Sequence, residues 1–166
     1  TMASMLAGKI PVMMNWTSGR RNVEHAMGVT DVRHVITSRV FLDLVDTDLE
    51  YLEDRMLFVE DIQSEIYIAQ KLGAFFNSKR SVKSLLLHFG ISDLKGDDPA
   101  VVLFTSGSEA APKGVPLSHR NILANIAAGM EILDFHSRSV FYGFLPPFHS
   151  FGLTVCTILP LVTGAK

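Results

Sequence analysis

Cysteine is almost absent from this sequence, which has a single one among 166 residues. One cysteine cannot form an internal disulfide, and the neighbours of Cys156, Val155 and Thr157, indicate an inert, buried thiol. The six histidines form no i, i+4 pair and no CxxC is present, so the ligand spacing of a structural metal site is missing. We therefore expect no metal site of the protein's own, and a reducing, cytoplasmic compartment.

An excess of positive charge is also missing. The chain has 15 Lys and Arg against 17 Asp and Glu, a formal net charge of -2, and its basic residues are scattered along the sequence. No basic field results that would gather a polyanion, so we expect no nucleic-acid partner. Residues 2–8 lack a basic leader followed by a long apolar run, so we expect no secretory signal.

Charged residues are missing altogether from residues 139–165, which contain no Asp, Glu, Lys or Arg. A span of this length could cross a bilayer. Its three prolines would break a spanning helix, however, and His149 and Ser150 would have to lie in hydrocarbon. We therefore expect buried core and part of a pocket wall.

Short apolar runs rich in branched residues alternate with amphipathic stretches. The runs that we expect to form strands are residues 10–15, 32–37, 57–59, 101–105 and 140–144. The stretches that we expect to form helices are residues 62–72, 82–89 and 118–133, the last with Ser118 as N-cap and with Ile122, Ile126, Met130 and Leu133 on one face. This alternation predicts an α/β fold of βαβ units around a parallel sheet, with residues 1–166 forming a single globular unit.

Residues 101–119 join an apolar strand-like run to a polar loop and a capped helix. The loop combines hydroxyl donors, a glycine that lets the backbone approach a ligand closely, and one compact positive charge: Thr105, Ser106 and Ser108; Gly107; and Lys113. These groups suit a polyphosphate anion such as the tail of ATP.

Two other glycine-containing motifs, the P-loop and the nucleophile elbow, do not fit this sequence. A P-loop needs a glycine directly before the lysine and a Ser or Thr directly after it, but Pro112 and Gly114 occupy those places. A nucleophile elbow needs Gly-x-Ser-x-Gly, which neither Ser108 nor Ser150 satisfies. The sequence therefore argues against a P-loop NTPase and against an α/β-hydrolase.

The loop resembles the phosphate loop of the adenylate-forming enzymes, the group of acyl-CoA synthetases, luciferases and peptide-synthetase adenylation domains. The matching letters are Thr105-Ser106-Gly107-Ser108-Glu109 and Pro112-Lys113-Gly114. Residues 145–153, Leu-Pro-Pro-Phe-His-Ser-Phe-Gly-Leu, resemble the acyl-pocket segment of the same family, and residues 8–17 and 36–39 also fit. The likeness is greatest to acyl-acyl-carrier-protein synthetases, including bifunctional enzymes that also carry a 2-acylglycerophosphoethanolamine (phospholipid) acyltransferase. One departure is Ala110, where the family usually has Gly or Ser and where a positive φ would strain alanine.

The resemblance implies a partial N-terminal domain of an enzyme that activates a fatty acid with ATP and Mg²⁺ and transfers the acyl group to a thiol. The thiol would be that of acyl carrier protein or, alternatively, of coenzyme A. Residues 105–108, Lys113 and Gly114 would bind the ATP phosphates. Phe148, His149 and Gly152 would border the acyl carboxylate, with His149 as the catalytic candidate. Peripheral association of the full-length protein with the inner face of the cell membrane is a further implication.

In that family the adenine-binding segment, the ribose-binding aspartate and a catalytic lysine lie downstream of the position of Lys166. We therefore expect the 166-residue chain alone not to catalyse adenylation. Two alternatives stay open. A binding-only module for acyl chains or carrier protein would fit Ala110 and the apolar tail, and a different nucleotide-binding domain would have no acyl pocket beside His149.

Overall fold

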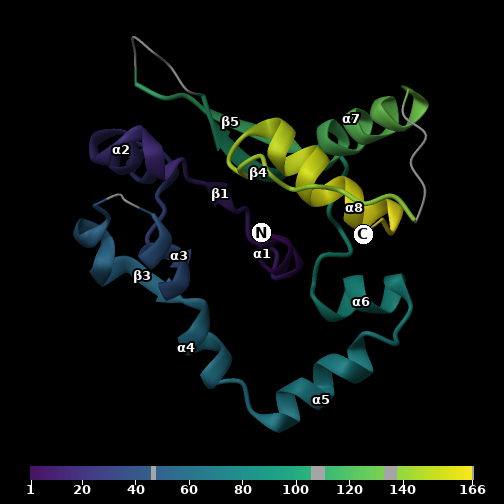
Figure 1. Ribbon diagram of the computed structural model, residues 1–166. Coiled ribbons are helices and arrows are strands. Elements are labelled where there is room, and N and C mark those ends of the chain that lie inside the picture. Colours follow the sequence, from purple (N-terminus) through teal and green to yellow (C-terminus); the bar gives the residue numbers. More distant parts are fainter. Residues whose placement is uncertain (46–47, 106–110, 133–137, 166) are drawn as a thin grey trace. The chain divides into compact units, whose positions relative to one another are not determined.

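The computed structural model describes residues 1–45, 48–105, 111–132 and 138–165. The chain forms two compact units, unit 1 with Thr1–Asn15 and Asp93–Lys166, and unit 2 with Trp16–Ser92 (Figure 1). That the whole chain forms one globular body stays a prediction.

Unit 1 is built around a three-stranded sheet in the order β1-β4-β5. Strand β4 (Pro99–Phe104) lies in the middle, parallel to β1 (Val12–Met13) and antiparallel to β5 (Gly114–Ser118). The sequence predicts β1 and β4, although β1 is shorter than the expected residues 10–15. It does not predict β5, because Pro116 disfavours a strand. Proline is tolerated here because β5 is an edge strand, where its missing N–H breaks no ladder.

The helical elements of unit 1 are α1 (Met2–Leu6), α7 (His119–Ile132), the π-helical segment η3 (Gly152–Ile158) and α8 (Leu159–Thr163). The core of the unit joins β4, α7, η3 and α8 through buried apolar side chains: Ala100, Val101, Leu103, Ile122, Ile126, Leu153, Ile158 and Leu159. The charge-free C-terminal segment thus contributes to a buried core, as predicted. In the part of the chain that the structure describes, no helix has the length and apolar character needed to span a membrane.

Helix α7 begins where the sequence places its N-cap. The Ser118 hydroxyl accepts a hydrogen bond from the Asn121 N–H (3.1 Å), and the Asn121 side-chain oxygen accepts one from the Ser118 N–H (3.0 Å). Ile122 and Ile126 are buried at 4% exposure each, as expected. Met130 on the same predicted face is 46% exposed, so the apolar face meets the core only along the first half of the helix. Leu133 lies outside the described residues.

The predicted strand at residues 140–144 does not form. The Phe144 N–H donates to the Tyr142 carbonyl at 3.0 Å, which is a tight turn rather than a strand ladder. Phe141 packs against the core while Val140 is exposed, so the side chains do alternate as in a strand. An extended segment becomes part of a sheet only where a neighbouring backbone supplies hydrogen-bond partners, and no described strand pairs with this one.

Unit 2 contains a second, two-stranded parallel sheet, in which β2 (Val35–Thr37) pairs with β3 (Met56–Phe58). Both strands are predicted, with small shifts of their ends. The helical elements of this unit are η1 (Trp16–Ser18), α2 (Arg20–Thr30), α3 (Arg39–Leu44), η2 (Glu50–Arg55), α4 (Val59–Ser64), α5 (Ile68–Asn77) and α6 (Val82–His88). Its buried apolar side chains come mainly from α2 and η2: Val23, Ala26, Met27 and Leu52.

The single helix predicted for residues 62–72 is wrong, since two helices, α4 and α5, occupy this region. Tyr67 between them is extended, and its N–H donates to the side-chain oxygen of Gln70 at 2.8 Å. This hydrogen bond satisfies an N–H at the start of a new helix and so favours the break. Helix α6 agrees with the predicted residues 82–89, and the Ser81 hydroxyl accepts from the Ser84 N–H at its start (3.3 Å).

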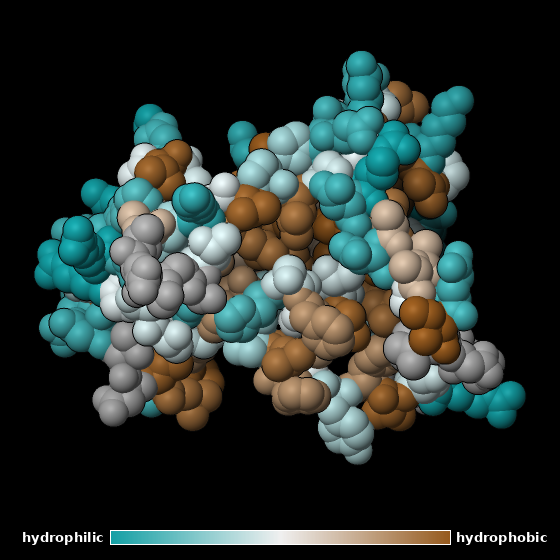
Figure 2. All heavy atoms as spheres, turned by 90° about the horizontal axis from the view of Figure 1, so that it is seen from above, coloured by the Kyte–Doolittle hydropathy of each residue, from teal (hydrophilic) through white to brown (hydrophobic). Residues whose placement is uncertain are grey.

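Large apolar side chains are exposed in both units. On the face drawn in Figure 2, brown apolar side chains reach the surface among the teal polar ones. In unit 1 the exposed set includes Ile132, Tyr142, Phe144 and Leu161. Many large apolar side chains of the described chain therefore lie outside its own core.

Candidate phosphate loop and acyl segment

The β4–β5 hairpin closes the base of the predicted phosphate loop. The Thr105 N–H donates to the Lys113 carbonyl (3.0 Å), and the Lys113 N–H donates to the Thr105 hydroxyl oxygen (3.1 Å). The antiparallel register continues with Phe104 opposite Gly114. The Thr105 hydroxyl is an acceptor in this pair, and a hydroxyl that accepts can also donate its own hydrogen to a ligand. The loop therefore starts at Thr105 and ends at Lys113, two candidate residues that are hydrogen bonded to each other.

Gly114 allows an aromatic ring to lie across the two strands at this base. A Cβ at Gly114 would be 3.3 Å from the Phe104 Cζ, tighter than an ordinary van der Waals contact. The structure thus gives Gly114 a packing role beside the loop. Its expected role in phosphate binding stays a prediction.

The two described polar candidates of the loop are accessible. Thr105 and Lys113 are both exposed, whereas Pro112 between them in the loop is buried and anchors it. No ion pair among the described residues involves Lys113. A lysine without an acidic partner is able to meet an incoming anion. The remaining loop candidates, Ser106, Gly107 and Ser108, lie outside the described residues, as do Glu109 and Ala110.

Polar contacts fix the start of α7 to the segment before β4. The Arg120 guanidinium contacts the Asp97 carboxylate through two hydrogen bonds (2.7 and 3.2 Å), and the Arg120 N–H donates to the Gly96 carbonyl (2.7 Å). The hydrogen bonds and charge of Arg120 lower the pKa of Asp97, and Asp97 in turn raises the pKa of Arg120. The chain therefore enters β4 and leaves β5 at one anchored point, which holds the hairpin between them.

The second group of candidates lies at the start of the helix that contains η3 and α8. Phe148 is buried at 6% exposure, whereas His149 is exposed, and their ring centroids are 4.7 Å apart. The His149 N–H donates to the Pro146 carbonyl (3.1 Å), and its carbonyl accepts from the Leu153 N–H (2.9 Å). These contacts fix the His149 backbone and leave its ring at the surface, against the buried Phe148.

Gly152 is required by the close approach of the preceding turn. A Cβ at this position would lie 2.2 Å from the Pro146 carbonyl oxygen and 2.9 Å from that of Leu145. No side chain can be placed there without moving the backbone. The π-helical turns begin at this residue, and the Thr157 hydroxyl donates to the Gly152 carbonyl (3.2 Å). Short π-helical insertions occur frequently at functional sites.

Both groups of candidates belong to unit 1. They are connected through the shared core, in which Leu103 of β4 and Leu153 of η3 are buried in one cluster. Within the described ranges, no hydrogen bond, ion pair or ring contact joins Lys113 to His149. The structure therefore brings together Thr105, Lys113 and Gly114 on one side, and Phe148, His149 and Gly152 on the other.

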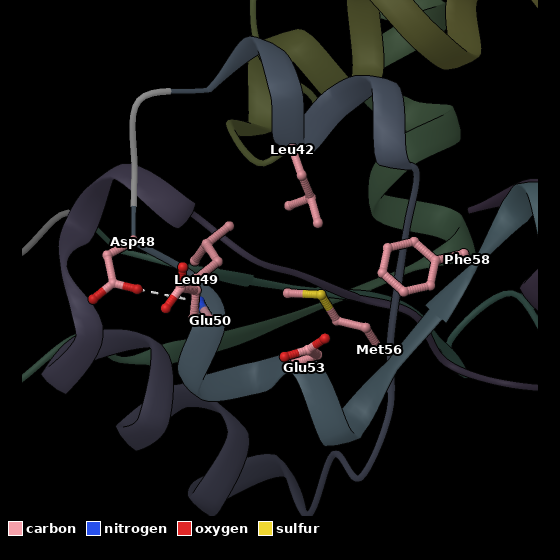
Figure 3. A pocket seen from close by; sticks show the side chains of 7 residues that line it. All are labelled: Leu42, Asp48, Leu49, Glu50, Glu53, Met56 and Phe58. Carbon is pink, nitrogen blue, oxygen red and sulfur yellow. Dashed lines mark hydrogen bonds between the residues drawn. The ribbon is translucent and has the colours of Figure 1, made fainter.

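Unit 2 contains a cavity of about 490 Å³ that the sequence does not indicate (Figure 3). Its lining comes from α3, η2, β3 and the residues before η2: Leu42, Asp48, Leu49, Glu50, Glu53, Met56 and Phe58. The Glu50 N–H donates to an Asp48 carboxylate oxygen at 3.2 Å. From sequence alone, the acidic residues between 43 and 54 are interpreted as a solvated face. The fold shows in addition that three of them line this cavity together with apolar side chains. In the described ranges, no three His, Cys, Asp or Glu side chains converge as metal ligands would.

Comparison with solved structures defines the fold. The structure of VinN with 3-methylaspartate superimposes with a TM-score of 0.73 at 21% identity, over 98% of this chain and 41% of that chain. A malonyl-CoA ligase with methylmalonyl-CoA and AMP bound gives a TM-score of 0.68 at 22% identity, over 99% of this chain and 30% of that chain. The α/β fold is that of the N-terminal domain of adenylate-forming enzymes, as the sequence predicts.

The sequence model of the AMP-binding enzyme family matches residues 1–166, and the chain belongs to this family. It is 42% identical over 71 residues to the medium-chain fatty-acid–CoA ligase of Escherichia coli K12. It is 36% identical over 72 residues to the medium-chain-fatty-acid–[acyl-carrier-protein] ligase JamA of Moorena producens. Each match covers 43% of this chain and 12% of the relative, and the chain spans less than half the length of the two solved structures.

Proposed function

We propose that this chain is the phosphate-loop part of an ATP-dependent ligase that activates a fatty acid and transfers it to a thiol. Its membership of the AMP-binding family supports this proposal, and so do two relatives named as fatty-acid ligases. The observation that carries it is the hairpin base. There, the exposed Thr105 and Lys113, which belong to the two parts of the matching loop motif, are hydrogen bonded to each other.

The chemistry that such a loop serves is the departure of pyrophosphate. A carboxylate oxygen of the fatty acid attacks the α-phosphorus of ATP, and the bond from that phosphorus to the β-phosphate oxygen breaks. The products are acyl-adenylate and pyrophosphate. Mg²⁺ arriving with ATP supplies further positive charge at the phosphates. Lys113 would neutralise the β- and γ-phosphates and Thr105 would donate its hydroxyl hydrogen, which positions the leaving group for in-line transfer.

The acyl carboxylate would lie beside the start of the η3 helix. His149 presents its ring at the surface, where an imidazole can donate a hydrogen bond to a carboxylate. The Phe148 ring lies against the His149 ring, with 4.7 Å between their centroids. Gly152 lets the helix start pack directly on the Pro146 carbonyl, so that it would form the closely packed wall of the site.

The thiol of acyl carrier protein is our first choice of acyl acceptor, because residues 145–153 most resemble that subgroup. Coenzyme A is the second candidate, supported by the 42% identity to a fatty-acid–CoA ligase. In either case the thiol sulfur attacks the acyl carbonyl carbon of the adenylate, and AMP leaves. Supplying the purified full-length protein with each acceptor in turn, and measuring the acyl-thioester formed, distinguishes the two.

The test of the proposal is fatty-acid-dependent exchange of labelled pyrophosphate into ATP by the full-length protein. We expect Lys113→Ala to lower the exchange rate on the order of a hundredfold, as loss of one transition-state donor does in other enzymes. The matched control is Lys95→Ala, another exposed lysine of unit 1 that lies before β4. No exchange by the wild-type protein with any fatty acid, or equal rates for both variants, would contradict the proposal.

A further inference from the structure

Helix α5 has an apolar face that points outward. Apolar residues recur at the helical spacing i, i+4, i+7 and i+8: Ile68, Leu72, Phe75 and Phe76. Such a stripe normally faces a core. Here the four residues are 77%, 54%, 58% and 67% exposed, and α5 contains no buried residue. The stripe therefore offers its apolar surface to something outside unit 2.

The charge within residues 66–92 is of one sign only, although Glu65 directly precedes this range and Asp93 directly follows it. Residues 66–92 contain four of the 15 Lys and Arg of the chain and none of its 17 Asp and Glu. Lys71 is on α5 itself, while Lys79 and Arg80 are in the turn that follows and Lys83 is on α6. The Lys79 ammonium lies 5.5 Å from the centre of the Phe75 ring, so positive charge and apolar stripe adjoin. This local excess contrasts with the net charge of -2 of the whole chain.

Helices α5 and α6 follow one another through this short basic turn (Figure 1). Asn77 at the end of α5 and His88 at the end of α6 share a hydrogen bond of 3.1 Å between their side-chain nitrogens. Helix α6 adds Val82 and Leu87, which are 72% and 60% exposed. We call residues 68–88 the basic helix pair.

We propose that the basic helix pair docks on an anionic lipid bilayer. A helix with this pattern lies in the plane of the interface, with its apolar side chains at the boundary between headgroups and acyl chains. Lysine and arginine beside it meet anionic headgroups, each adding an attraction equivalent to about a fivefold gain in binding. Docking through these residues does not depend on the ligase activity.

A bilayer fits better than an acidic protein partner. The stripe consists of large apolar side chains on an outward helix face, with its cations beside it, which is the arrangement of interfacial helices.

The test is co-sedimentation of the full-length protein with vesicles of phosphatidylglycerol and phosphatidylcholine in equal parts, and of phosphatidylcholine alone. We expect binding to the anionic vesicles that weakens as salt is raised. The triple variant K79E/R80E/K83E should lose binding on the order of a hundredfold, since three attractions become repulsions. The double variant Phe75→Ser with Phe76→Ser should also lose binding, even at low salt.

Matched controls separate the helix pair from general effects. K9E/R21E/R138E changes the net charge equally at exposed positions elsewhere, and Leu44→Ser with Ile132→Ser removes two apolar side chains that are 80% and 84% exposed. Both controls should bind as the wild type does, and circular dichroism should show all variants folded. Equal binding to both vesicle types, or equal losses in variants and controls, would overturn the proposal. The proposal would also be overturned if K79E/R80E/K83E bound vesicles as the wild type does but no longer bound an acidic carrier protein.

Discussion

Helices α7 and α5 carry the same sequence pattern and have opposite surroundings. Ile122 and Ile126 on α7 are four residues apart and 4% exposed each, whereas Ile68 and Leu72 on α5 have the same spacing and are 77% and 54% exposed. The first pair packs on β4 and η3 within unit 1. In the described part of unit 2, nothing buries the second pair. Helical periodicity thus identifies an apolar face, but the neighbours decide whether that face is core or docking surface.

The largest expected difference between the two helices is in the free energy of unfolding. Ile126→Ala should lower it by about 2–5 kcal/mol, because truncation leaves a cavity in the shared core of unit 1. Leu72→Ala should change it by less than about 0.5 kcal/mol, because the side chain already faces solvent. Urea unfolding followed by circular dichroism measures both. A loss at Leu72 as large as that at Ile126 would show that α5 is covered in solution.

A second comparison uses one glycine from each region. Gly152→Ala should lower the free energy of unfolding by about 1–3 kcal/mol, because its Cβ would lie 2.2 Å from the Pro146 carbonyl oxygen. Gly73→Ala on α5 meets no atom within 4 Å and should raise helix stability by about 0.5–1 kcal/mol. Thermal unfolding of the two variants should therefore shift in opposite directions. Shifts of the same sign would refute the crowding inferred at Gly152.

The smallest expected effect is the pH dependence of one ion pair in each unit. Arg120 lowers the pKa of Asp97 in unit 1, and Arg39 lowers that of Asp61 in unit 2, in both cases from 3.8 and mainly through side-chain hydrogen bonds. A carboxyl group whose pKa is lower in the folded state stabilises that state above its unfolded pKa. This contribution is lost as the pH falls through the folded pKa.

Asp97→Asn and Asp61→Asn should each lower the melting temperature slightly at pH 7, since both pairs are exposed. The difference from the wild type should shrink as the pH falls through the folded pKa of each carboxyl group, which lies below 3.8. Melting curves between pH 2.5 and 7 measure this. A difference that persists at the acid end would mean that the pairs act by packing rather than by charge.

The sequence predicts the local framework of the candidate site well. The Ser118 cap of α7, the strand before the loop and the order of strand, loop and helix all follow from residue types at short spacing. It misses β5, because Pro116 is acceptable only at a sheet edge. It also predicts a strand at residues 140–144, which has the right residues but no partner strand. Both errors concern whether a segment finds a partner strand with which to pair.

Some properties of the candidate residues could not be predicted. The hydroxyl and amino groups of Thr105 and Lys113 follow from sequence, but their mutual hydrogen bonds follow from the antiparallel register of β4 and β5. The need for glycine at position 152 arises from a carbonyl of the preceding turn. The unit 2 cavity gathers residues from separate elements, so short-range spacing gives no sign of it.

The sequence by itself determined the chemistry of this protein: a hydroxyl-rich loop with one lysine, a capped helix, a charge-free C-terminal segment and a basic stretch without acids. These depend on residue type and on spacing within a few turns, where backbone geometry is nearly fixed. Only the tertiary structure decided which apolar faces are buried, where β5 pairs and why Gly152 has no alternative. Such outcomes depend on strand register, on backbone close approaches and on contacts between elements, which local periodicity does not encode.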